Sequence, residues 1–154
     1  MNAEDSLTER RLEVVREHML SENEHRFDDT LATFDHPRYE IVGTGDVYDG
    51  AAEVSDYYRA SRAAFPDQRN ENTVLHAAED AVIAEFDLVG THLGELRGIP
   101  PTGRSFRCRM CAVFEFEPQG AEIACERVYF DQGTIARQLL EEGSALGGGE
   151  PQPA

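Results

Sequence analysis

The chain has 154 residues and a formal net charge of −16, with 30 acidic side chains against 14 basic ones. This excess of negative charge argues against nucleic acid and membrane surfaces as partners, because both attract positive charge. The length suits one domain, which we place at residues 1–142, and no apolar run reaches the roughly 20 residues that span a bilayer.

Cysteine usage and the N-terminus bear on the compartment. Three cysteines are an odd number, which fits a reducing cytoplasm better than a disulfide framework. The N-terminus lacks the charged-then-apolar order of a signal peptide, so we predict a cytoplasmic protein. Cys108 and Cys111 form a Cys-x-x-Cys pattern, but mid-strand side chains at this spacing point to opposite faces, which disfavours a redox or metal pair.

The first two predicted elements are helices. Residues 6–20 carry apolar residues at helical spacing, and the run from Ser6 to Glu9 matches a capping box at their start. A second, short helix follows, with Phe27, Leu31 and Phe34 on one face. It must end near residue 35, because the residue before a proline is biased out of the helical region.

A strand at residues 38–42 and a loop or small hairpin piece at 43–49 precede a third helix at 50–65. The inward stripe of this helix is predicted to comprise Val54, Tyr57, Tyr58, Ser61 and Phe65. A further strand begins near Thr73. After the main strands, residues 132–140 predict a last helix, with Asp131 as its N-cap. Residues 143–154 are predicted to be a disordered tail, because they carry nothing to bury.

Residues 82–131 contain three runs rich in β-branched and aromatic residues, separated by glycine and proline. This pattern predicts an antiparallel meander, which cannot stand alone in water and needs helices over one face. The fold class is therefore α+β. We predict a curved antiparallel sheet with the N-terminal helices packed on its concave face and a pocket between them.

Alternation within the meander assigns its faces. In the first strand Ala84, Phe86 and Leu88 share the inward face, while Glu85 and Asp87 share the outward one. In the second strand Arg107 and Arg109 point outward, so acids should face arginines across the outer surface. The inward residues of the second strand are Phe106, Cys108, Met110, Ala112, Phe114 and Phe116.

The third strand has two possible orientations. If Arg127 joins the outer charges, the inward residues are Ala124, Glu126, Val128 and Phe130. The opposite orientation buries Arg127 with Cys125 and Tyr129. We prefer the first, because one charged residue among three apolar ones fits a half-buried strand.

A long motif at residues 90–106 reads GTHLGELRGIPPTGRSF. It resembles the G-T-H-x-G-E-x-x-G-x-P-P-T-G signature of SnoaL-like proteins, the polyketide and ester cyclases. Residues 126–139, ERVYFDQGTIARQL, are similar to the closing strand and final helix of that family. The resemblance implies the cone-shaped α+β barrel of the nuclear-transport-factor-like superfamily, and a homodimer formed through the outer face of the sheet.

The best-known cyclases of this family close a ring by intramolecular aldol condensation, without cofactor or metal. The resemblance implies an aspartate on the last strand as general acid/base, with a histidine and an amide on the preceding strand. Here the aspartate position falls on Val128 or its neighbour Arg127, the histidine position on Ala112 and the amide position on Met110. The fold is expected to carry over, but that mechanism is not.

Glu126 and His92 are the candidate catalytic residues. A carboxylate in an apolar cavity has its pKa raised toward values useful for proton transfer, unless a structural partner holds it. His92 could act as an acid/base or hydrogen-bond the adjoining loop. No metal spacing is evident around His25 or His36, and we expect neither metal nor cofactor. The candidate ligand-binding residues are Tyr57, Tyr58, Phe86, Met110, Ala112, Phe114 and Val128.

Three functions are compatible with these features. The first is a small cofactor-free enzyme of isomerase, cyclase or hydratase type, in which Glu126 moves protons and His92 or a tyrosine polarises a carbonyl of an apolar oxygenated substrate. The second is a binding module for an apolar small molecule. The third is a dimeric assembly domain whose pocket is filled by Phe86, Met110, Phe114 and Phe130. A pocket lined by Glu126 would support the first two.

Overall fold

The computed structural model describes residues 2–141, which form four helices and six strands. The helices are α1 (Ala3–Asn23), α2 (Phe27–Leu31), α3 (Ala51–Ala64) and α4 (Gln132–Leu140). The strands are β1 (Arg38–Ile41), β2 (Asp46–Asp49), β3 (Arg69–Ala77), β4 (Ala81–Thr91), β5 (Ser105–Phe116) and β6 (Ile123–Tyr129). The tail predicted at residues 143–154 lies outside the described residues.

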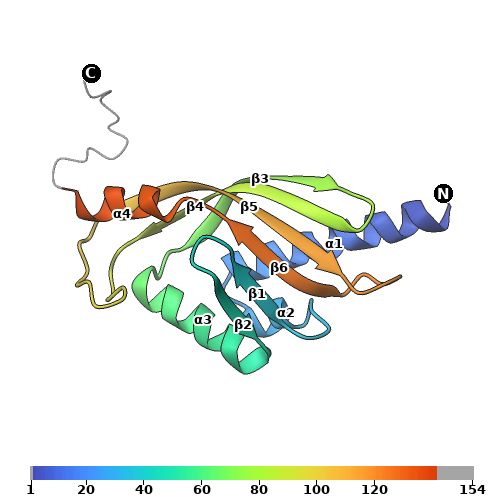
Figure 1. Cartoon of the computed structure of the whole chain (residues 1–154), viewed down its shortest axis with the longest axis horizontal. Coiled ribbons are helices and arrows are strands. Elements are labelled where there is room, and N and C mark those ends of the chain that lie inside the picture. The colour runs from blue at the N-terminus through green and yellow to red at the C-terminus, as the bar shows by residue number, and fades with distance from the viewer. Residues whose placement is uncertain (1, 142–154) are drawn as a thin grey trace, which may run out of the picture.

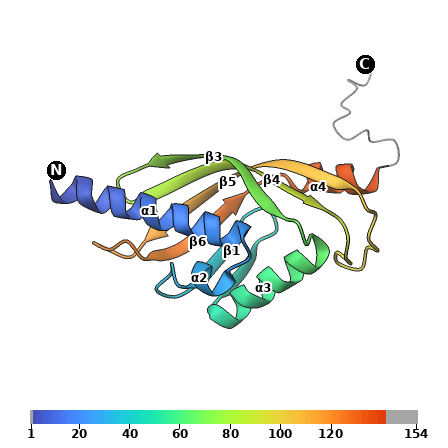
Figure 2. The ribbon, with the colours of Figure 1, turned by 180° about the vertical axis from the view of Figure 1, so that it is seen from behind.

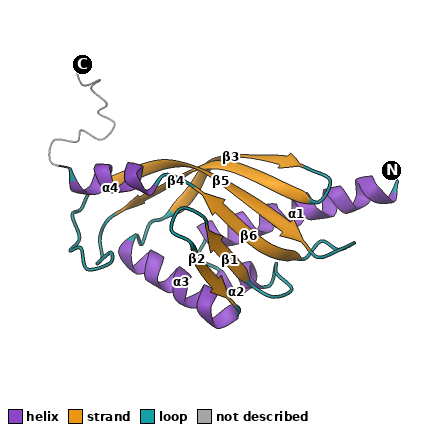
Figure 3. Cartoon of the chain, in the orientation of Figure 1, coloured by secondary structure: helices purple, strands orange, loops and turns teal. Residues whose placement is uncertain are grey.

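The strands form one curved, open sheet in the order β2-β1-β6-β5-β4-β3. All neighbours are antiparallel except β1 and β6, which run parallel. Figures 1 and 3 show the long strands arching over the three N-terminal helices, and Figure 2 shows α1 running across the inner side of the sheet. The predicted α+β architecture, with helices on the concave face, is confirmed. No helix within residues 2–141 has the length and apolar character needed to cross a bilayer.

The start of α1 differs from the prediction. Asn2 is the N-cap, and its side chain accepts a hydrogen bond from the Asp5 amide at 2.8 Å. The capping box at Ser6 to Glu9 is therefore wrong, because these residues lie inside the helix. Asparagine is a strong N-cap, and acidic residues in the first turn favour the same start through the helix dipole.

The faces of β4 and β5 are as predicted. Arg107 and Arg109 lie exposed on the outer face and contact Asp87 at 3.0 and 3.3 Å. Glu85 does not join this arginine ladder, because the register places it opposite Cys111. It instead contacts His76 of β3 at 2.8 Å.

The last strand places Glu126 and Val128 inward and Arg127 outward, as preferred. Its beginning differs from simple alternation. The pairing of β5 with β6 shifts between Glu115 and Phe116, so that Phe116 pairs with Ile123. This irregularity buries Ile123 completely and leaves Ala124 only half-buried, which corrects the predicted inward position of Ala124.

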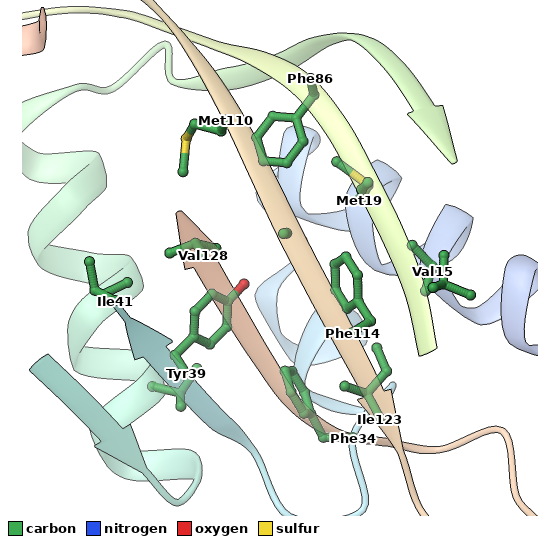
Figure 4. Close-up of a cluster of buried hydrophobic side chains, with 14 of the residues drawn as sticks. Val15, Met19, Phe34, Tyr39, Ile41, Phe86, Met110, Phe114, Ile123 and Val128 are labelled. Atoms are coloured by element: carbon green, nitrogen blue, oxygen red, sulfur yellow. The ribbon is translucent and has the colours of Figure 1, made fainter. Parts of the chain in front are cut away.

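The main core lies between the helices and β4, β5 and β6. Figure 4 shows side chains from α1, from the sheet and from the α2–β1 segment meeting there, with the Tyr39 hydroxyl directed into the interior. A second cluster joins α4 to the far end of the sheet through Leu139, Phe106, Cys108 and Phe65. Residues of both clusters line the larger of the two cavities described below.

Candidate functional site

Two neighbouring cavities lie between the helices and the concave face of the sheet. The outer cavity has a volume of about 360 Å³, and its wall includes residues of α3, α4 and the β4–β5 loop. The inner cavity has a volume of about 30 Å³ and includes both Glu22 and Glu126 in its wall. The two cavities share four wall residues, which are Tyr57, Gln68, Leu88 and Met110.

Glu126 is held at the inner cavity by a partner on α1. The residue is 5% exposed, and its Oε1 lies 2.7 Å from Nε2 of the fully buried His18. The contact has the distance of a hydrogen bond but not its alignment, so we treat it as an ion pair. Because Oε1 is fully enclosed, the exposure that the side chain keeps faces the inner cavity.

Thr33 determines which nitrogen of His18 faces Glu126. The Thr33 hydroxyl donates to the carbonyl oxygen of Thr30 at 2.6 Å, so it accepts from His18 Nδ1 at 2.9 Å. Nδ1 therefore carries a hydrogen, and Nε2 faces the carboxylate. Two facing lone pairs at 2.7 Å would repel, so the His18–Glu126 pair must hold one further proton. When this proton is on Nε2, the N–H is directed at the Tyr39 hydroxyl oxygen, 3.2 Å away.

Glu22 forms a second ion pair, with Arg62 of α3, which is neutral on its own. Its Oε1 accepts from Arg62 at 3.1 Å, and its Oε2 accepts from the Tyr39 hydroxyl at 3.1 Å. The Tyr58 hydroxyl donates in turn to that of Tyr39 at 3.2 Å. The two carboxylates, the guanidinium and one shared proton on His18 sum to zero charge, which is the arrangement least costly to bury.

Burial and neighbouring charge set the protonation of this cluster. Burial opposes the charged form of His18, but the negative charges of Glu126 and Glu22 raise its pKa to about 9. Burial also opposes ionisation of Glu22, yet the close contact with His18 and the charge of Arg62 lower its pKa to about 2. Burial raises the pKa of Glu126, although the positive charge of His18 acts in the opposite direction. The His18–Glu126 pair therefore holds its shared proton more tightly than free groups would.

His18, Glu22 and Glu126 also form a cluster of potential metal ligands, which their spacing in the sequence does not reveal. Potential ligand atoms of His18, Glu22 and Glu126 lie within 4.8 Å of one another. A divalent ion would displace the shared proton and leave the buried cluster with a net positive charge, because Arg62 already neutralises one carboxylate. The charge balance thus favours a proton over a metal ion at this position.

Two polar side chains in the shared wall have no hydrogen-bond partner within residues 2–141. One is the hydroxyl of Tyr57 on α3, and the other is the amide of Gln68, which is 6% exposed. Burial raises the pKa of Tyr57, so its hydroxyl keeps its hydrogen and can donate it. Both groups are available to a ligand in either cavity.

The other predicted site residues are placed differently from Glu126. His92 is fully buried, lines only the outer cavity and accepts the Thr102 amide hydrogen at Nδ1 over 3.3 Å. The structure therefore does not bring His92 and Glu126 to one cavity. Of the predicted apolar wall, Phe86, Met110 and Val128 line the inner cavity. The remaining predicted residues, Tyr58, Ala112 and Phe114, line neither cavity and lie in the core.

Sequence reasoning missed His18, Glu22, Arg62 and Gln68. A signal for the first two was present, because His18 and Glu22 share the buried face of α1 with Val15 and Met19 at helical spacing. Apolar spacing alone assigns that face, and it leaves out the polar residues there. Arg62 lies on α3 and reaches Glu22 only through the packing of two helices, which no local pattern reveals.

The model of the SnoaL-like polyketide cyclase family matches residues 11–139. No curated protein matches the sequence significantly. A candidate polyketide cyclase of Xanthomonas campestris pv. campestris is 16% identical with a TM-score of 0.77, covering 86% of this chain and 98% of that one. IdmH of Streptomyces antibioticus, also a candidate polyketide cyclase, is 20% identical with a TM-score of 0.70, covering 84% and 97%. AclR of Streptomyces galilaeus, a candidate hydroxylase, is 17% identical with a TM-score of 0.73, covering 88% and 85%.

Proposed function

Since the chain belongs to the SnoaL-like polyketide cyclase family, we propose that it is a cofactor-free enzyme that moves protons on an apolar, oxygenated small molecule. The reaction is of the isomerase, cyclase or hydratase type, and Glu126 is its general acid/base. The observation that carries this proposal is the buried Glu126 carboxylate, which pairs with His18 and lines a cavity that shares four wall residues with a larger one.

The position of the shared proton determines whether Glu126 can act as a base. When the proton sits on His18, Glu126 is a carboxylate and can remove a proton from the carbon beside a carbonyl group. The C–H electron pair then forms a carbon–carbon double bond, and the carbonyl electrons move to the oxygen. The Tyr57 hydroxyl lies in the same wall and can donate to that oxygen. Return of the proton from Glu126 to a different atom completes an isomerisation.

The cavity walls favour this proposal over the assembly domain. An outer cavity of about 360 Å³ is of the size that small-molecule sites occupy, and a filled sheet face would leave no such space. The binding module remains the second candidate, because the resemblance places the functional positions of the aldol cyclases on Met110, on Ala112 and on Val128 or Arg127. Two of the three similar structures described above bear names of candidate polyketide cyclases, which fits carbonyl chemistry but identifies no substrate.

Deuterium exchange separates the enzyme from the binder. Apolar aryl ketones such as 2-acetonaphthone, incubated with the protein in D2O, should exchange the protons next to the carbonyl, as measured by the loss of their NMR signal. Glu126→Gln preserves the shape and removes the base, so the exchange should fall by roughly 100-fold or more.

Glu85→Gln is the matched control, because Glu85 is an exposed carboxylate on the outer face of β4 and should leave exchange unchanged. Melting temperatures of both variants show whether the fold is intact. If every ketone that binds exchanges no faster with wild type than with Glu126→Gln, the protein is a binding module and the enzymatic proposal is wrong.

A further inference from the structure

Gln68 lines both cavities but has no role in the proton-transfer cluster of His18, Glu22, Arg62 and Glu126. It lies between α3 and β3, and its backbone is fixed there. The backbone N–H of Gln68 donates to the Phe65 carbonyl oxygen at 3.0 Å. Two residues later, Asn70 is held through both backbone groups by the Asn23 side chain, at 2.7 and 3.0 Å. The main chain on each side of Gln68 is thus anchored, while its own side chain bonds to none of the described residues.

The Gln68 side chain is 94% buried and has no hydrogen-bond partner among the described residues. Its amide atoms are not fully enclosed, so they keep surface in the cavities that the residue lines. A fixed, unpaired amide at a cavity wall calls for a physical explanation, and a bound ligand group supplies one. Gln68 lines both cavities, and so does Tyr57, whose hydroxyl is equally free. The two other shared wall residues, Leu88 and Met110, are apolar. The junction between the cavities therefore presents two neutral hydrogen-bond donors in an apolar surrounding.

We propose that the Gln68 amide and the Tyr57 hydroxyl together bind one carbonyl oxygen of the substrate at the junction of the two cavities. The proposal rests on the proposed function, since it places that oxygen beside the proton-transfer residue Glu126 in the inner cavity. The substrate class is a neutral apolar ketone or ester that carries an acidic C–H next to its carbonyl. A carboxylate substrate is disfavoured, because both donors are neutral and two carboxylates already lie nearby.

The two donors serve the reaction because of where charge develops. When Glu126 accepts the proton, the C–H electron pair becomes part of the carbon–carbon double bond and one negative charge arises on the carbonyl oxygen. Donors already fixed at that oxygen stabilise this charge more than they stabilise the neutral ketone. No oxidant, reductant or second substrate is needed, because the proton moves to Glu126 and back.

Binding of a matched ligand pair tests this site directly. 2-Acetonaphthone and 2-ethylnaphthalene have nearly the same shape and differ in the carbonyl oxygen. Wild type should bind the ketone about three- to tenfold more tightly, as expected for a net hydrogen bond. Gln68→Met keeps the length of the side chain without its amide and should remove most of this preference. Adding Tyr57→Phe should remove the rest.

Gln132→Met is the control, because Gln132 is a glutamine in the wall of the outer cavity alone and should keep the preference. An unchanged preference in Gln68→Met would overturn the inference. The deuterium exchange assay supplies a second readout, since Gln68→Met should lower the rate at saturating ketone by about tenfold or more while Glu126 is present.

Failure of this inference and of the proposed function can be told apart. If the ketone preference depends on Gln68 but wild type gives no Glu126-dependent exchange, the carbonyl site stands and the protein is a binder. If exchange depends on Glu126 while the Gln68→Met variant keeps both the preference and the rate, Gln68 has no role in substrate binding.

Discussion

At the residue scale, His18 links the protonation of the site to the stability of the fold. Its pKa is raised from 6.5 to about 9 in the folded chain, so the fold favours protonated His18. The contribution of His18 to the free energy of unfolding is fully present below pH 6.5 and is lost as the pH rises toward 9. The pKa of Glu22 is lowered from 4.5 to about 2, so its contribution is present above pH 4.5 and is lost below it. The cluster stabilises the protein most between these limits.

The free energy of unfolding of the wild type should therefore fall by about 3 kcal/mol between pH 6.5 and pH 9. His18→Gln should start less stable and show little of this decline, because the group that loses its proton is gone. Urea denaturation at several pH values measures both. His36→Gln, at an exposed histidine, should decline in parallel with wild type. A wild-type stability that does not change over this range would show that His18 is neutral in the fold.

At the scale of elements, the β4–β5 loop owes its position to Gly94. The amides of Leu93 and Gly94 both donate to the Ala64 carbonyl, at 3.0 and 3.1 Å, which ties the loop to the end of α3. A Cβ atom at Gly94 would lie 1.9 Å from the Ala63 carbonyl oxygen. This loop supplies several residues of the outer cavity wall, so its contact with α3 shapes the cavity.

Gly94→Ala should force the loop away from α3 and cost about 1–3 kcal/mol of stability, as overpacking does. Ketone binding in the outer cavity should weaken as well. Gly120→Ala is the matched control, because the nearest atom to its added Cβ lies 3.6 Å away. Thermal denaturation and ligand titration give the comparison. Equal stability of the two variants would mean that the close approach at Gly94 is not needed.

The elements themselves could be predicted well where local periodicity controls them. Alternation assigned the faces of β4 and β5 and turned Glu126 inward, because one face of the sheet is buried. It failed at Ala124, where a shift in strand pairing breaks the alternation. The partners of Glu126 could not be predicted, since the pairing with His18 depends on how α1 crosses the sheet. Gln68 lies in a polar connection whose proximity to the cavities only the folded chain shows.

At the scale of the whole molecule, we propose a homodimer formed through the outer face of the sheet. This face carries paired charges and partly exposed apolar residues, with Val74 49% and Tyr129 42% exposed and Cys111 and Val113 half-buried. Val89 shares the outward parity of Glu85 and Asp87 on β4, but it is buried and adds no surface. A two-fold arrangement would let the same surface bind itself.

Light scattering at micromolar concentration should give twice the chain mass of 17.2 kDa. An interface of about 1,000 Å² or more in total is expected for a stable pair. Tyr129→Glu should produce monomers by placing an unpaired charge in it. Leu20→Glu, at an equally exposed apolar residue of α1, should leave the dimer intact. A wild-type protein that is monomeric at these concentrations would rule the dimer out.

The central claim is that His18 and Glu126 share one tightly held proton at the wall of the substrate cavity. An NMR titration of the Glu126 carboxyl carbon and the His18 ring nitrogens measures this most directly, with Glu126→Gln and His18→Gln as assignment controls. The account predicts that His18 stays protonated at Nδ1 throughout, that the Glu126 pKa lies above 4.5, and that the pair releases its shared proton only near pH 9. Independent titration of Glu126 near pH 4.5 and His18 near pH 6.5 would contradict it.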